Sequence, residues 1–390
     1  MGQADGTLTL ASNASKVLRA SAVHFQSRDP LKFLSGALGS EPLELVILFV
    51  SPKADIHRVA VEAGRYFRDA TVVGCTTAGE ISNSGYTEDE IVAIGLPRSH
   101  FRARTTLVED LNRFEPHALI DKLVATRNDL ASEVPDWSNE FNFLLIDGMS
   151  GKEDGFAVTL SSGWGPAPLF GGSAGDGTRF QTTFILHNET VFPQDAAIIT
   201  HIRTKCPVQV FKTDHVTPTE RRMVVTGADP SRRLVHEINA EPAAQEYARL
   251  IGLETRDLSA AVLGANPVVV RIAGQHYVRG IRNVTKDGSL LFTAAIDEGL
   301  VLTLAETKDI AGHLRRQMQE LTRERELVGV IACDCLYRRT DAEQNKVLGE
   351  VSEILGQYRV FGFSSYGELF NSMHVNQTLT GVAIYAPPEV

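Results

Sequence analysis

Three short stretches of this chain combine a hydroxyl side chain with a carboxylate at the same spacing. In each stretch a Ser or Thr stands three residues before an acid: Thr77 and Glu80, Ser173 and Asp176, Ser365 and Glu368. Carboxylates serve as general acids or bases, and hydroxyls bind polar ligands or act as nucleophiles. Thr76 and Tyr366 adjoin two of these hydroxyls. These eight residues form the candidate ligand-binding set.

The surroundings of the three carboxylates are also alike. Each acid directly follows a glycine, and each stretch follows a short apolar run. This pattern is typical of a buried strand that breaks into a tight turn, although glycine and small hydroxyl residues also occur in turns without any function. Because the pattern occurs three times in one chain, it predicts a repeated structural unit.

Each turn lies inside a longer block, at about 45–96, 143–202 and 328–385. A block contains an apolar strand, a helical stretch, a second strand with its turn, and a closing strand. Continuous apolar runs indicate strands buried on both faces, and a strand-helix-strand order favours parallel pairing. We expect the closing strand to add antiparallel. The sequence therefore predicts an α/β fold of repeated strand-helix-strand-strand units, with mixed sheets covered by helices. Ligands of such sheets collect beyond the carboxyl ends of strands, where the turns would lie.

Further elements precede, follow or interrupt these blocks. Additional helical patterns lie at 12–22, 30–38, 116–132, 234–251 and 307–326, and the helix of the third block lies at 341–356. Hairpin signals at 268–272 and 276–278 predict an inserted antiparallel β-rich section. The composition changes near 203–206, so we place an N-terminal domain at 30–203 and a C-terminal domain at 204–387.

Composition excludes several classes of protein. The net charge of the 390 residues is -10, which argues against a nucleic-acid partner. No apolar run approaches the roughly 20 residues of a membrane helix, and residues 1–6 lack a signal-peptide pattern. Four cysteines are too few for a disulfide framework in a chain of this length. We therefore expect a cytoplasmic protein without a membrane or nucleic-acid partner, and the sequence leaves open whether it forms a homo-oligomer.

Familiar catalytic and metal motifs are missing. The glycine-rich stretch 171–177 is similar to a phosphate loop but lacks the Lys-Ser/Thr pair that should follow it. Ser173 and Ser365 lack the G-x-S-x-G pattern of hydrolases. Cys333 and Cys335 would share one strand face, but no second pair completes a metal site, so buried core thiols are favoured.

The turns and their surroundings resemble a known family. Residues 73–80 resemble the signature of the N-terminal FIST domain. Residues 235–243 through 298–299, together with 362–368, resemble the C-terminal FIST domain. The resemblance covers about 30–387 and implies a small-ligand sensor in signal transduction. Stand-alone members include bacterial nitric-oxide-sensing proteins that bind haem and control a partner histidine kinase. With no segment left for an output domain, the resemblance implies control of such a kinase in trans.

Haem would need an axial side chain, most often a histidine. His187 and His374 each lie in an apolar neighbourhood shortly beyond a repeat turn, and we name them as candidate haem ligands. His24 and His276 are weaker candidates. Each of the four is also compatible with an ordinary half-buried histidine.

Two functional hypotheses remain open. The first is a non-catalytic sensor whose pocket lies at the turns. The second is an enzyme that uses Glu80, Asp176 or Glu368 as acid-base groups. Because no nucleophile-base-orienter pattern is visible, the sensor is favoured. The three carboxylates either face one cavity, with Arg179 as cationic partner, or cap backbone amides of their own turns.

Overall fold

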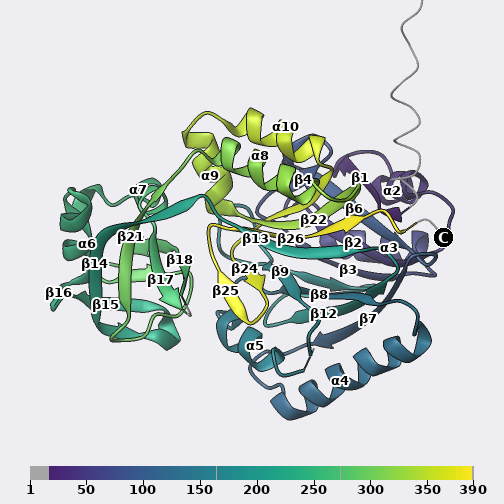
Figure 1. Ribbon diagram of the computed structural model, residues 1–390, viewed down its shortest axis with the longest axis horizontal. Helices are drawn as coiled ribbons and strands as arrows, with labels where there is room; N and C mark the ends of the chain where they lie inside the picture. Colours follow the sequence, from purple (N-terminus) through teal and green to yellow (C-terminus); the bar gives the residue numbers. More distant parts are fainter. Residues whose placement is uncertain (1–16, 164, 273, 389–390) are drawn as a thin grey trace, which may run out of the picture.

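The computed structural model describes residues 17–388 apart from 164 and 273, and its main body consists of three repeated units (Figure 1). Unit 1 contains β1 (Arg19–His24), α2 (Pro30–Leu38), β2 (Leu43–Val50), α3 (Ile56–Tyr66), β3 (Thr71–Thr76), β4 (Glu80–Ser82), β5 (Gly85–Thr87) and β6 (Glu90–Pro97). Unit 2 contains β7 (Phe101–Val108), α4 (Pro116–Glu133), β8 (Asn139–Ile146), α5 (Glu153–Leu160), β9 (Leu169–Ser173), β10 (Ile185–His187), β11 (Thr190–Phe192) and β12 (Ala197–Thr204). Unit 3 contains β13 (Val208–Thr213), α8 (Ile310–Leu321), β22 (Leu327–Cys335), α9 (Leu336–Gln344), α10 (Leu348–Gln357), β23 (Val360–Ser365), β24 (Glu368–Phe370), β25 (Met373–Val375) and β26 (Leu379–Tyr385).

Each unit forms the same four-stranded portion of a mixed sheet. In unit 1 the strand order is β1-β6-β2-β3, with β2 parallel to β3 and antiparallel to β6. Units 2 and 3 repeat this order as β7-β12-β8-β9 and β13-β26-β22-β23. The predicted fold class, the repeated units and the antiparallel closing strand are therefore confirmed.

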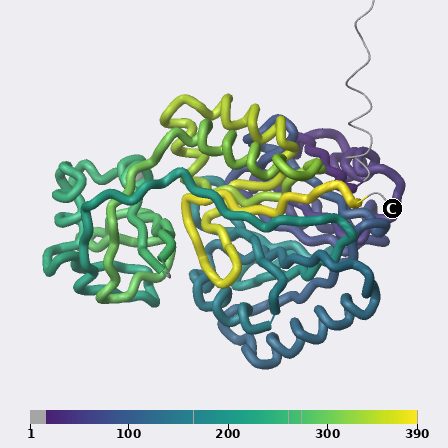
Figure 2. Tube along the Cα trace, viewed as in Figure 1, coloured from purple at the N-terminus to yellow at the C-terminus, as the bar shows by residue number. Residues whose placement is uncertain are grey.

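The hairpin that follows each turn leaves its own unit and joins the sheet of another. β4–β5 of unit 1 pairs with β23 of unit 3, and β10–β11 of unit 2 pairs with β3 of unit 1. β24–β25 of unit 3, yellow in Figure 2, pairs with β9 of unit 2. The exchange is cyclic, and it completes three six-stranded sheets.

The three sheets share one central core because their strands bury both faces. In β2 the side chains alternate: Ile47 and Phe49 join the central cluster, whereas Leu48 packs with residues of α2 and α3. The ring of Phe49 stacks on Phe363 of β23 at 4.6 Å between centroids. Helices cover the outer face of every sheet, α2 and α3 in unit 1, α4 and α5 in unit 2, and α8 to α10 in unit 3.

A separate section lies between β13 and α8, to one side of the main body (Figure 1). We call residues 216–307 the insert. Its elements are β14 (Val216–Asp229), η1 (Pro230–Arg232), β15 (Leu234–Ile238), β16 (Glu241–Pro242), α6 (Ala243–Ile251), η2 (Thr255–Asp257), α7 (Ala260–Ala265), β17 (Val268–Ile272), β18 (Gln275–Arg279), β19 (Ile281–Val284), β20 (Leu290–Phe292) and β21 (Val301–Thr307). Its strands pair antiparallel around a hydrophobic core of its own, as predicted for this section.

Some predicted helices are wrong in extent or type. Residues 19–22 form strand β1, while the rest of the predicted helix 12–22 lies almost wholly outside the described residues. The predicted helix 234–251 begins only at Ala243, because 234–238 pair in the antiparallel sheet and Pro242 directly precedes the helix. The stretch 341–356 falls into two helices, with Lys346 at a φ of 59° between them.

The structure also describes the cysteines and the apolar character of the helices. All four cysteines are buried free thiols, which confirms the prediction made for Cys333 and Cys335. Among the residues that the structure describes, none of the helices has the length and apolar character needed to cross a membrane.

Candidate functional site

The three turns meet where the units come together, and backbone hydrogen bonds join them in a ring. In each bond an amide of one turn donates to a carbonyl of another: Gly175 to Thr76 (3.0 Å), Ala78 to Ser364 (2.8 Å) and Ser173 to Gly367 (2.9 Å). The predicted ligand-binding set is thus brought to one place, although its side chains point to different partners.

Glu80 and Glu368 make equivalent contacts in units 1 and 3. Glu80 accepts from the Thr77 hydroxyl of its own turn and from the amide of Glu90, ten residues later (3.1 Å). Glu368 accepts from the Ser365 hydroxyl (2.7 Å) and from the amide of Thr378, again ten residues later (3.2 Å). Burial raises the pKa of Glu80 to about 7 and that of Glu368 to about 8. Each carboxyl group therefore connects its turn to the start of the closing strand.

Asp176 departs from this scheme. Its carboxylate accepts from three amides of the following loop and from the hydroxyl of Tyr366. The loop amides belong to Phe180, Gln181 and Thr182. These amides of the loop that follows the glycine-rich stretch are therefore occupied by the protein's own carboxylate rather than offered to a phosphate.

In unit 2 another acid binds the closing strand. Asp147 accepts from the amide of Asp195 at 2.7 Å and from the hydroxyl of Thr183. Sequence reasoning missed Asp147 as a site residue. Its position directly after the apolar run 143–146 was the signal that could have identified it.

The buried carboxyl of Glu368 predicts a specific pH dependence of stability. Its pKa is about 8 in the folded protein, against an ordinary value of 4.5, so the folded state keeps a proton that the unfolded chain releases. This contribution to stability is complete below about pH 4.5 and is lost as the pH rises through about 8. Glu368→Gln, which is always neutral, should show a smaller decline over this range in urea denaturation. Glu353→Gln on the exposed face of α10 is the control, and equal pH slopes for wild type and Glu368→Gln would contradict the assignment.

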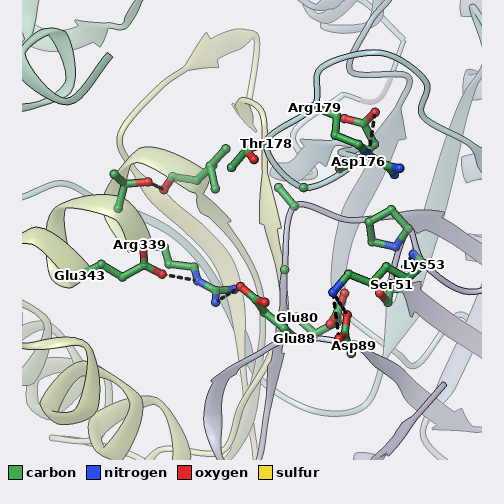
Figure 3. Close-up of a pocket in the computed structure, with 16 residues that line it drawn as sticks. Ser51, Lys53, Glu80, Glu88, Asp89, Asp176, Thr178, Arg179, Arg339 and Glu343 are labelled. Carbon is green, nitrogen blue, oxygen red and sulfur yellow. Dashed lines mark hydrogen bonds and ion pairs between the residues drawn. The ribbon is translucent and has the colours of Figure 1, made fainter. Parts of the chain in front are cut away.

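A cavity of about 330 Å³ opens beyond the carboxyl ends of β2 and β3 (Figure 3). We call it the three-unit cavity because unit 1 supplies Ala78, Gly79 and Glu80, unit 2 supplies the turn at 176–179, and unit 3 supplies α9. Glu80 and Asp176 both line it. Glu368 does not; it is fully buried elsewhere in the ring of turns.

The charges of the three-unit cavity form ion pairs across its walls (Figure 3). Arg339 of α9 contacts Glu88 at 2.8 Å and Glu343 at 3.1 Å. Lys53 pairs with Asp89 at 2.9 Å, and Arg179 lies 3.8 Å from Asp176, the partner expected for it. The lining holds five acids and three bases, so its formal charge is negative.

Sequence reasoning missed two cations of this cavity. Lys53 follows the first strand of its block by a few residues, and Arg339 lies shortly after the apolar run at 328–333. The rule that ligands collect beyond strand ends could have selected both.

The remaining predicted residues point away from the three-unit cavity. Thr76 accepts from the amide of Phe184 at 3.0 Å, and Ser173 donates to Glu153 at 3.3 Å. Thr77 and Ser365 donate to their own turn acids, as described above. Tyr366 lines a second cavity, together with Phe180 of the loop that follows Asp176.

The two histidines proposed for haem each lie close to a polar side chain of the protein. His187 lies 3.0 Å from the Thr105 hydroxyl through Nε2, and burial lowers its pKa. His374 is 3% exposed, and its Nδ1 lies 3.4 Å from Asp154. Neither lines the three-unit cavity or the second cavity. Within 17–388, excepting the two undescribed positions, no group of three or more His, Cys, Asp and Glu side chains is placed to hold a metal ion. Haem binding stays a prediction.

His24 and His276 are both exposed and likewise line neither cavity.

Comparison with known proteins agrees with the architecture. The FIST N domain model matches residues 44–241, and the FIST C domain model matches residues 243–371. The two matches meet inside the insert, between β15 and α6, rather than at the limit of a repeated unit. No curated protein matches the chain. The two domain models together span the ring of turns, both cavities and most of the three units, and the chain belongs to the FIST family.

Proposed function

We propose that the chain is a small-ligand sensor and that the three-unit cavity is its ligand site. FIST domains are associated with signal transduction and small-ligand sensing. The observation that carries the proposal is that segments of all three units line one cavity beyond the ends of buried strands. A ligand there contacts all three units, so its affinity depends on how they are arranged. Such a ligand shifts the population towards the arrangement that it binds best.

The charges of the cavity select the chemical class of the ligand. Five acids face three bases, and each base is already in an ion pair. An anionic ligand would have to break one of these pairs, whereas a cationic group can share the acids. We therefore expect a small polar ligand that is cationic or neutral.

The experiment compares panels of small amines, neutral polyols and carboxylates by the rise in melting temperature that they cause. A ligand that binds only the folded state raises the melting temperature by an amount that grows with the logarithm of the ratio of its concentration to its Kd. We expect hits among the amines or polyols. Glu88→Gln/Glu343→Gln should weaken an amine hit by about tenfold, since each charge-assisted contact is worth about 1.5–3 kcal/mol before screening.

Glu353→Gln, an exposed acid of α10 outside the cavity, is the matched control and should bind the hit as wild type does. The proposal fails if only carboxylates stabilise the protein, or if the double variant and the control respond alike.

The family resemblance also motivates a proposal for the output. The activity of a separate histidine kinase would depend, in trans, on whether this protein has its ligand bound. A phosphorylation assay with candidate kinases, with and without the hit, tests this step alone. A kinase is excluded if its autophosphorylation rate is unchanged by adding the protein, both without ligand and with the hit bound.

An enzyme remains the second candidate, favoured by one observation. Glu80 lines the cavity with a pKa of about 7, the range suited to a general acid or base. Its oxygens are engaged by Thr77 and by the amide of Glu90, which favours the structural role. Conversion of a hit by wild type and its loss in Glu80→Gln, with binding retained, would establish the enzyme instead.

A further inference from the structure

A second cavity, of about 240 Å³, lies between the main body and the insert and is lined by residues of both. The main body supplies the loop 148–153 before α5, together with Phe180 and Tyr366. The insert supplies η1 with Arg233, Arg282 of β19 and residues of β20. We call it the insert cavity. Phe180 lines the insert cavity, whereas the preceding residues 176–179 line the three-unit cavity.

The charge of the insert cavity is opposite to that of the three-unit cavity. Four bases and one acid line it: Lys152, Arg232, Arg233, Arg282 and Glu153. Arg233 is neutralised by Glu153 at 2.6 Å and by Asp154 at 3.2 Å. The other three bases form no ion pair with any residue that the structure describes. Three bases without ion pairs therefore line one concave site, and Glu153 is the one acid among its lining residues.

The best placed of these cations is Arg282, because an aromatic platform fixes its orientation. Its guanidinium carbon lies 4.4 Å from the centroid of the Phe180 ring, and Phe180 stacks on Tyr366 at 4.1 Å. Tyr366 is held in turn by its hydroxyl, which donates to Asp176 and accepts from the amide of Phe180 at 3.2 Å. A guanidinium stacked on a ring keeps its N–H groups in the plane available for a planar or tetrahedral oxyanion.

The first turn of α5 lies at the same cavity. The helix begins at Glu153, and its N-cap residue Lys152 gives it no side-chain cap. The two acids of that turn, Glu153 and Asp154, are directed to Arg233 of the insert. The amide end of the helix, with its partial positive charge, is therefore near the same cavity as Lys152.

We infer that the insert cavity is an oxyanion site that binds a phosphate group, either as the free ion or on a small phosphorylated molecule. The three cations without ion pairs, the oriented guanidinium and the uncapped helix start all favour a compact group of high negative charge. The volume is several times the roughly 30 Å³ that one water occupies in the liquid, which leaves room for a short substituent. This site is independent of the sensor proposal, because the two cavities share no lining residue.

Titration calorimetry at constant ionic strength, with inorganic phosphate and with glycerol 3-phosphate, tests the site on the full chain. We expect Arg282→Gln and Lys152→Gln each to weaken binding by about tenfold, and the double variant by more. Arg222→Gln, which removes an exposed cation of β14 outside the cavity, should change affinity by less than about twofold. Melting temperatures check that each variant is folded, and Lys152→Gln, at an exposed position, keeps the test valid if Arg282→Gln is unstable.

The outcomes distinguish the two possible ligands and also define what would overturn the inference. Equal binding of both probes supports recognition of the phosphate group alone, and tighter binding of glycerol 3-phosphate supports a phosphorylated small molecule. The inference is overturned if neither probe binds below about 10 mM, if the double variant binds as wild type does, or if Arg222→Gln loses as much affinity as the cavity variants.

Discussion

Arg338→Met should lower the free energy of unfolding by about 3–5 kcal/mol, because it leaves a buried charge without its partner. Arg338 is fully buried, and its Nε donates to Asp334 at 2.6 Å. Its Nη1 lies 2.9 Å from Nδ1 of His215, and Asp334 also accepts from the Tyr86 hydroxyl. Without the guanidinium, the Asp334 carboxylate must stay ionised in an apolar setting or take up a proton. Urea denaturation of the purified variant measures the loss.

Two further variants isolate the cause. Arg338→Met/Asp334→Leu removes both charges and should recover part of the lost stability, since apolar replacement of a buried pair is often neutral or favourable. Arg315→Gln breaks an exposed pair with Glu350 on the neighbouring helices and should cost at most about 1 kcal/mol. A loss of less than about 1 kcal/mol in Arg338→Met would mean that the pair does not stabilise unit 3 as described.

Gly362→Ala is expected to cost about 3 kcal/mol or more, at the upper end of the range for overpacking. A Cβ at this position would overlap sterically with the carbonyl oxygen of Ala332 on the parallel strand. The same close approach occurs in the other units, where Gly74 faces the Leu48 carbonyl and Gly171 faces that of Leu144. Because the obstructing atom is backbone in a buried sheet, the clash cannot be relieved by a side-chain rotation. Urea denaturation of the purified variant measures this cost.

Gly349→Ala provides the matched control. Gly349 lies in α10, and an added Cβ meets nothing within 4 Å. Its replacement should stabilise the protein by about 0.5–1 kcal/mol, since alanine loses less backbone entropy in a helix. If both substitutions had the same effect, backbone freedom rather than the close approach of β22 and β23 would explain Gly362.

The repeat was predictable because its signals are local. A short apolar run, a hydroxyl-rich turn and a Gly-acid pair lie next to one another in the chain, so 360–363, Gly367 and Glu368 identify a buried strand and its turn. The antiparallel pairing of the closing strand was predicted from the same local pattern. These features depend on neighbours in sequence, and the structure retains them in all three units.

The rest depends on partners that are distant in sequence. Residues 234–238 looked helical, but they pair with β14 and β20, whose positions no local pattern gives. Glu368 looked equivalent to Glu80 and Asp176, yet only the last two reach the three-unit cavity. The cavity is completed by α9, more than 150 residues after Asp176 in the chain, and its Arg339 carried no motif.

The cyclic exchange of hairpins has a consequence for synthesis on the ribosome. Ile81 of β4 pairs with Gly362 of β23, so the hairpin emerges roughly 280 residues before its partner. At about 5–20 residues per second, the hairpin waits roughly 15–55 seconds with its edges unpaired. Unit 1 can complete its sheet once 185–192 emerge, whereas the sheet of unit 2 stays open until 368–375 are made and that of unit 3 until 379–385 are made. Exposed strand edges invite pairing with other chains during that interval. Nascent chains stalled before residue 360 should therefore be the aggregation-prone species and the ones that engage chaperones.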